Sequence, residues 1–375
     1  MTLSVARRGS RAVVAAAAVA ICCAVDAAPA FAQAGAARRP SQRKWTLEVH
    51  GGIGIQPAPA GSPGQLPAGS AFGTASGSTS RANASWFFGD GALLFNQVKA
   101  QFATLYRVQF AEIVPLDAVI TTRAFDSPRT PGFGVRVARS IVRRVALELS
   151  IDQAEAKPRL SGATRDAIEA TRASFESGFR GLLGTIPQTG LQVASTAEVV
   201  QSRSSETSLT AAVVVSPIMR GGLTVYALAG GGQLRSEGTP IEVRLRGQYQ
   251  FRVFDQYPIN ESDSVVIRVT RASTVPMAVV GAGVTIDIGA RLAVRVDVRD
   301  HIGRTGFGMT LDASPAVSAG TPAIAVPSLT TPSVQFSTVS GVRSSLSGTT
   351  TGLQTFTSGR QESRLLTSAG LVLRF

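Results

Sequence analysis

Cysteine is confined to the N-terminal segment of this 375-residue chain. Cys22 and Cys23 both precede Ala32, in a stretch with three arginines, an apolar run at 12–25 and an Ala-Phe-Ala ending. These features predict a secretory signal peptide, residues 1–32, that is cleaved after Ala32. The remaining chain, 33–375, is predicted to be one domain with no thiol, disulfide or cysteine-based metal site.

Long hydrophobic runs are missing after the N-terminal segment. The chain is 44% hydrophobic and only 16% charged, with a mean hydropathy of +0.17. Such a composition is typical of membrane proteins, yet no run of eighteen apolar residues is present to form a spanning helix. An apolar chain can still meet lipid through short strands closed into a barrel, because unpaired backbone is too costly in hydrocarbon.

Lysine is scarce, so arginine carries almost all of the positive charge. Lys44, Lys99 and Lys157 are the three lysines, and the formal net charge is +13. The arginines are spread along the chain without a cluster, which argues against a nucleic-acid partner. After export, the anionic partner we expect is lipopolysaccharide, although charge alone selects no ligand.

Enzyme signatures are also missing. The chain has no HExxH, GxSxG, phosphate-binding loop or GxGxxG motif, and only two histidines, His50 and His301. Asp300 precedes His301, but neighbours on a strand face opposite ways and form no natural catalytic pair. His50 is predicted to share a hydrogen bond with Glu48. We therefore expect no enzyme activity, cofactor or metal site.

The last sixteen residues, 360–375, carry the clearest pattern. From Leu365 to Phe375 the odd-numbered positions are nearly all apolar and the even-numbered ones are mixed. A period of two is typical of a β-strand with one apolar face. This strand ends the chain on an aromatic residue, and its odd-numbered face is predicted to meet lipid.

Seven further segments show strand-like alternation. They are Trp45–Ile55, Phe133–Ile141, Arg143–Ala154, Ser204–Pro217, Leu223–Ser236, Met277–Ile288 and Arg291–Ile302. The connections between the eight strands alternate between long and short. This pattern predicts an all-β fold, a transmembrane antiparallel up-and-down barrel with short periplasmic turns and long extracellular loops.

The long connections hold further predicted elements. Residues 241–270 alternate as two strands, which would stand above the membrane as a hairpin or extend the barrel to ten strands. A helix is predicted at about 164–183, with Thr164 as its N-cap. A shorter helix is predicted to follow Asp90. These helices either pack on neighbouring loops or cap the mouth of the barrel.

Charged residues on the inner face of an eight-stranded barrel would meet in a lumen that side chains can fill. Both signs are present, and paired charges offset the cost of burial. The interpretation is a salt-bridged polar plug; a narrow ion path is the alternative. The predicted lumen charge network consists of Glu48, Arg136, Glu148, Arg295, Asp297 and Arg299, with Asp152, Glu206, Asp287 and Arg374 also facing inward.

The signal peptide, Trp45 at the start of the first strand, the eight alternating strands and the ending Leu371–Phe375 together resemble small bacterial outer-membrane barrels of the OmpA transmembrane-domain and OmpW kind. The resemblance implies the outer membrane as location, and Phe375 as the assembly signal that the barrel assembly machinery reads.

The resemblance also implies a structural, surface-contact or small-solute passage role. Because the lumen is predicted to be filled and the loops are long, we expect a monomer with a structural or surface-interaction role. A narrow channel for small or hydrophobic solutes is the alternative, and a surface hydrolase at Asp300-His301 is a second one.

Overall fold

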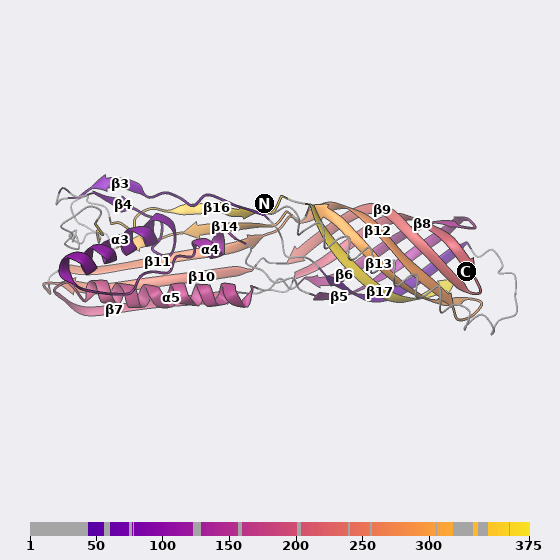
Figure 1. Cartoon of the computed structure of the whole chain (residues 1–375), viewed down its shortest axis with the longest axis horizontal. Coiled ribbons are helices and arrows are strands. Elements are labelled where there is room, and N and C mark those ends of the chain that lie inside the picture. The colour runs from indigo at the N-terminus through magenta and orange to yellow at the C-terminus, as the bar shows by residue number, and fades with distance from the viewer. Residues whose placement is uncertain are drawn as a thin grey trace.

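The computed structural model describes residues 44–55, 61–74, 77, 79–122, 129–156, 160–200, 204–238, 241–255, 257–304, 306–317, 333–336, 344–359 and 361–375. They form an elongated molecule with a β-barrel at one end and a second sheet with helices, the head, at the other (Figure 1). No helix among these residues is long and apolar enough to cross a membrane. The predicted signal peptide lies outside the described residues.

Within the described residues, eight antiparallel strands close into a barrel, which confirms the predicted architecture. Each strand pairs with its predecessor in the barrel, and β1 pairs with β17 to close the ring. The long connections leave from the end that bears the head. The barrel strands are β1 Trp45–Ile55, β5 Arg129–Val142, β6 Val145–Ala156, β8 Ser204–Arg220, β9 Leu223–Gly238, β12 Thr274–Asp287, β13 Leu292–Arg304 and β17 Gln361–Arg374.

The strand register sets the width of the barrel. Glu48 of β1 pairs with Arg136 of β5. From Arg136, the successive partners on the following strands around the barrel are Ser150, Thr210, Gly232, Met277, Gly303 and Glu362. On its other side Glu48 pairs with Val372, ten residues beyond Glu362. Eight strands with this offset tilt by about 40° and form a cylinder of about 8 Å backbone radius. Large side chains can fill a lumen of this width.

Side chains alternate between the outside of the barrel and its lumen. Val49, Leu149 and Leu371 point outward and are 61%, 60% and 59% exposed, whereas Glu148 and Val372 are buried inside. The outer surface is therefore a belt of aliphatic side chains, as the period of two in the sequence predicts.

The long connections meet in a second sheet that forms the head. Its strands lie in the order β2-β16-β14-β11-β10-β7, with β15 also paired to β11, and β3 and β4 form a separate hairpin. β10 and β11 are the hairpin predicted at 241–270, so the barrel has eight strands and not ten. The bounds are β2 Ser62–Pro63, β3 Ser70–Gly73, β4 Thr79–Ala82, β7 Gln188–Val200, β10 Glu242–Val253, β11 Tyr257–Thr270, β14 Gly308–Ala313, β15 Ala316–Val317 and β16 Thr350–Thr357.

Three helices of the described chain belong to the head: α3 (Gly89–Tyr106), α4 (Asp117–Ile120) and α5 (Gly162–Leu183). They pack on one face of the sheet and do not cap the barrel mouth (Figure 1). The opposite face stays polar and open, because the alternate β10 residues Arg244, Arg246 and Gln248 are exposed.

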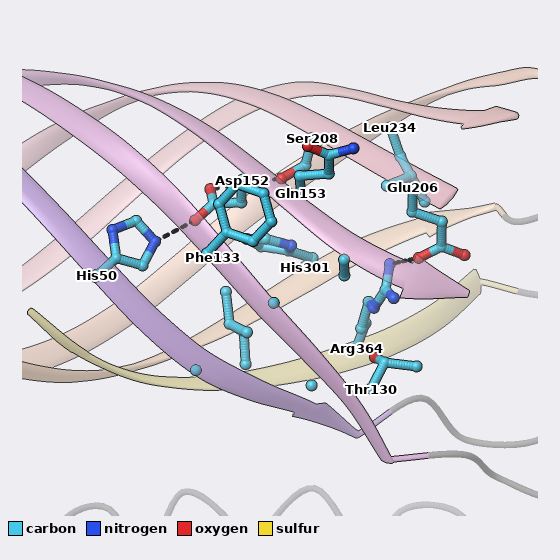
Figure 2. A pocket seen from close by; sticks show the side chains of 15 residues that line it. His50, Thr130, Phe133, Asp152, Gln153, Glu206, Ser208, Leu234, His301 and Arg364 are labelled. Atoms are coloured by element: carbon cyan, nitrogen blue, oxygen red, sulfur yellow. Dashed lines mark hydrogen bonds and ion pairs between the residues drawn. The ribbon is translucent and has the colours of Figure 1, made fainter. Parts of the chain in front are cut away.

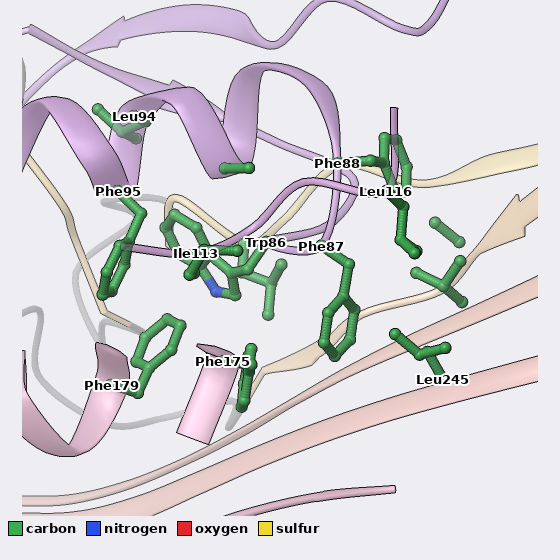
Figure 3. Close-up of a cluster of buried hydrophobic side chains, with 14 of the residues drawn as sticks. Trp86, Phe87, Phe88, Leu94, Phe95, Ile113, Leu116, Phe175, Phe179 and Leu245 are labelled. Atoms are coloured by element: carbon green, nitrogen blue, oxygen red, sulfur yellow. The ribbon is translucent and has the colours of Figure 1, made fainter. Parts of the chain in front are cut away.

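Aromatic side chains hold the helices on the sheet (Figure 3). Phe179 of α5 stacks on Tyr249 of β10, with ring centroids 4.5 Å apart, and meets Trp86 edge-on at 5.6 Å. A Cβ at Gly247 would collide with the Phe175 ring, so the glycine lets the helix lie close. The head thus has its own hydrophobic core, which the sequence had not predicted.

Some predicted boundaries were wrong. Helix α5 begins at Gly162, and its N-cap is Ser161, whose hydroxyl accepts from the backbone N–H of Thr164 at 3.1 Å. Helix α3 begins at Gly89, so Asp90 lies within its first turn and is not the cap. The sequence predicts no strands at β7, β14 and β16, because their periodicity is weak and their partners are distant in sequence.

Candidate functional site

Three arginines and three carboxylates form a closed circuit of ion pairs across the lumen, which we call the ion-pair ring. Arg136 Nη1 donates to Glu48 Oε1 at 2.8 Å, and Arg295 Nη1 donates to Glu48 Oε2 at 3.0 Å. Glu148 Oε2 accepts from Arg295 Nη1 at 2.6 Å, and its Oε1 lies 2.8 Å from Arg299 Nη2. Each of these carboxylates is therefore bridged by two arginines.

Asp297 completes the ring. Its Oδ2 accepts from Arg299 Nη2 at 2.9 Å and from Arg136 Nη1 at 2.8 Å. Tyr226 donates to the same oxygen at 2.8 Å, and Ser368 donates to Oδ1 at 2.5 Å. The structure thus brings together all six residues of the predicted lumen charge network and adds two hydroxyl groups.

The barrel places these residues on facing walls of the lumen. Glu148 lies on β6, and its two arginine partners lie on β13; the strands β8, β9 and β12 separate β6 from β13 around the wall. The ring side chains are 1–8% exposed. Three positive charges balance three negative ones, so each buried ion has a partner of opposite charge. Removing one partner of such a buried pair lowers the free energy of unfolding by about 3–5 kcal/mol.

Glycines make room for the ring in the barrel wall. A Cβ at Gly283 would collide with the Tyr226 hydroxyl and lie 2.6 Å from Asp297 Cβ. A Cβ at Gly370 would lie 2.9 Å from Glu48 Oε1. The ring packs against bare backbone at these points, so the lumen is filled at this depth.

A cavity lies in the barrel on the head side of the ring. Figure 2 shows the side chains that line it. It is small, with a volume of about 30 Å³, and is lined among others by His50, Asp152, Glu206, His301 and Arg364. His50 Nε2 is 2.6 Å from Asp152 Oδ1, whereas His50 Nδ1 is 3.7 Å from Glu48 Oε1. The close partner of His50 is therefore Asp152, and the predicted hydrogen bond to Glu48 is wrong.

The remaining predicted inward residues lie at the two ends of the barrel. Glu206 is buried at the head end and pairs with Arg271 and Arg364. Asp287 and Arg374 pair at 2.6 Å at the turn end, where both are partly exposed. Arg364 could have been found from the parity of the closing strand, since it shares its face with Ser368.

The Asp300 and His301 side chains point in opposite directions. His301 is buried in the lumen, and its Nε2 has no hydrogen-bond partner among the described atoms. Asp300 accepts a hydrogen bond from Ser363 at 2.6 Å, and it is only partly buried. This arrangement brings no acid–base pair together. Across the described residues, no group of His, Cys, Asp or Glu side chains is arranged to hold a metal ion.

Asp263 on β11 is fully buried in the head and forms no ion pair with a described residue. Burial raises its pKa to about 7, although hydrogen bonds from the Trp86 backbone N–H at 2.6 Å and Ser85 at 2.8 Å act in the other direction. This buried carboxyl could not be predicted, because its neighbours come from segments distant in the chain.

Phe375 lies at the turn end of the barrel, where its backbone exchanges hydrogen bonds of 3.0 and 3.2 Å with Trp45. Its side chain is exposed. The beginning of the first barrel strand and the end of the last one thus lie together at the end of the barrel opposite the head.

No protein-family model matches the chain, and no curated protein matches it either. Among solved structures, CarO of Acinetobacter baumannii is 11% identical, with 65% of this chain and 94% of CarO covered and a TM-score of 0.25. The monoaromatic hydrocarbon channel CymD is 9% identical, with 89% of each chain covered and a TM-score of 0.18. The toluene transporter TodX of P. putida is 8% identical, with 90% and 91% covered and a TM-score of 0.16. The barrel architecture therefore rests on the strand pairing of this chain.

Proposed function

We propose that this chain is a monomeric outer-membrane barrel that displays its head at the cell surface, in a structural or surface-interaction role without enzymatic activity. The belt of aliphatic side chains around the closed barrel supports the membrane placement, because only lipid suits such a surface. The predicted signal peptide and the closing strand ending at Phe375 support export and insertion by the barrel assembly machinery.

The head is the observation that carries the surface role. Four separate connections of the barrel build one sheet with its own aromatic core, and the helices leave one sheet face open. Loops that only join strands need no shared core. The open face presents Arg246, Gln248 and Arg252, a polar surface suited to contacts with hydrophilic partners, such as lipopolysaccharide sugars and phosphates, outside the cell.

The sequence has no cysteine after residue 32, so single introduced cysteines provide a direct test of orientation. In intact cells, a membrane-impermeant maleimide should label Thr196→Cys on the open face of the head and should not label Gly289→Cys at a barrel turn. After the outer membrane is permeabilised, both should react. Labelling of only the turn variant in intact cells would refute surface display.

A narrow channel is the second candidate, because the cavity beside His50 and His301 opens part of the lumen. The ion-pair ring separates this cavity from the turn end, so we expect the intact protein to be silent in planar bilayers. Steady single-channel conductance of the unaltered protein would favour the channel instead.

A further inference from the structure

The turn end of the barrel carries a collar of exposed cations, although the sequence shows no basic cluster. The collar consists of Lys44, Arg139, Arg143, Arg144, Arg220 and Arg291. None of these side chains forms an ion pair with a described residue.

The collar differs from the head end of the same barrel. At the head end, Arg235 pairs with Glu237 at 2.9 Å and Arg364 pairs with Glu206, whereas Arg129 and Arg304 form no ion pair with a described residue. At the turn end, the one acidic side chain of the described residues is Asp287, which is held by Arg374. The collar therefore keeps a net positive charge within the described chain.

Exposed apolar side chains lie directly beside the collar. Ile141, Ile218 and Ile288 at the turns are 55%, 43% and 64% exposed. Trp45 is 42% exposed and lies under the Arg139 guanidinium, 5.3 Å from its ring centroid. An apolar belt that ends in a tryptophan and arginines is the arrangement of a membrane interface, where long basic side chains reach the headgroups.

We propose that the collar binds the phosphate groups of anionic phospholipids in the leaflet next to the barrel turns. The cations are distributed over all the turns of the rim and do not converge on one point, which fits a lipid leaflet better than a single small anion. Five of the six are arginines, whose planar guanidinium groups can bind phosphate with two hydrogen bonds. This inference rests on the proposed membrane placement of the barrel.

Trp45 provides a probe at the collar. The full-length protein is folded into phosphatidylcholine vesicles that contain a trace of either phosphatidylglycerol or phosphatidylcholine with a dansyl-labelled acyl chain. Energy transfer from Trp45 is obtained by subtracting the signal of the Trp45→Phe variant, which keeps Trp86. Since each cation near an anionic surface changes partitioning by about fivefold, we expect several-fold more transfer to the phosphatidylglycerol probe, and a loss of this preference in high salt.

Two variants with the same change in net charge separate the collar from the general charge of the protein. The collar variant combines Arg143→Gln, Arg144→Gln, Arg220→Gln and Arg291→Gln and should lose the preference. The head variant combines Lys99→Gln, Arg107→Gln, Arg165→Gln and Arg180→Gln, which lie outside the open face of the head sheet, and should keep it.

Three outcomes would overturn the proposal: equal transfer to both probes, equal loss in both variants, or displacement by inorganic phosphate beyond that caused by sodium chloride of the same ionic strength. The last outcome would assign the collar to a free anion. Heat-modifiability gels on the same vesicles report insertion separately. A protein that fails to insert contradicts the proposed function, whereas an inserted protein without lipid preference contradicts only the collar.

Discussion

Opening the ion-pair ring should destabilise the barrel strongly. Arg136→Leu removes the donors that Glu48 and Asp297 use at 2.8 Å and leaves a net negative charge among the remaining buried ring members. Breaking a buried pair in this way costs about 3–5 kcal/mol. With a urea dependence of about 1–3 kcal/mol per molar, the unfolding midpoint should fall by roughly 1–5 M.

The double variant Glu48→Gln with Arg136→Gln tests the same reasoning in the opposite direction. It removes one charge of each sign, so the four remaining ring members stay neutral, and stability should recover by about 2 kcal/mol or more relative to Arg136→Leu. Arg246→Leu on the head surface is the control and should change stability by less than about 0.5 kcal/mol.

The assay is urea unfolding of the protein in lipid vesicles, followed on heat-modifiability gels. A loss below about 1 kcal/mol in Arg136→Leu would refute the reasoning. The single variants Glu48→Gln and Arg136→Gln are measured in the same way. A double variant whose loss of stability equals the sum of their two losses would also refute the reasoning, because the effects of independent residues add whereas those of members of one ring do not.

Three further predictions concern the belt, the head and the wall of the barrel. Leu371→Arg places a charge on the lipid face and should cost roughly 2–4 kcal/mol near the bilayer midplane, measured by the same urea assay. The pKa of Asp263 is raised to about 7 from 3.8, so the free energy of unfolding of the head should fall as pH rises from about 4 to about 7. Trp86 fluorescence during unfolding should show this loss of stability, roughly 4 kcal/mol at most, and Asp263→Asn should remove the pH dependence. In Gly283→Val the added Cβ collides with the Tyr226 hydroxyl, and the folded fraction on gels should fall. In Gly289→Val the added Cβ meets no atom within 4 Å, and the folded fraction should not change.

The barrel could be predicted from the sequence because its physical requirement is local. Each strand must show lipid one face and the lumen the other, so Leu371 and Val372, or Val49 and Glu48, differ in kind at successive positions. The same parity assigned the six ring residues to the lumen. Parity could not show that Arg299 pairs with Glu148 or that Arg136 pairs with Asp297, because ten residues of stagger around the barrel decide which side chains share a depth.

The hairpin at 241–270 and the helix at about 164–183 could be predicted, but their assembly into the head could not, because it depends on contacts between connections distant in sequence. Phe179, Tyr249 and Trp86 meet only when three of these connections fold together. The collar has the same origin: its arginines are scattered in sequence, and the up-and-down topology gathers them at one rim. The sequence by itself determined the barrel and its inner and outer faces, since these follow from the period of two. The choice between eight and ten strands came from the structure, in which the hairpin at 241–270 belongs to the head. The tertiary structure alone decided the ring, the head and the collar, since each depends on which distant strands become neighbours.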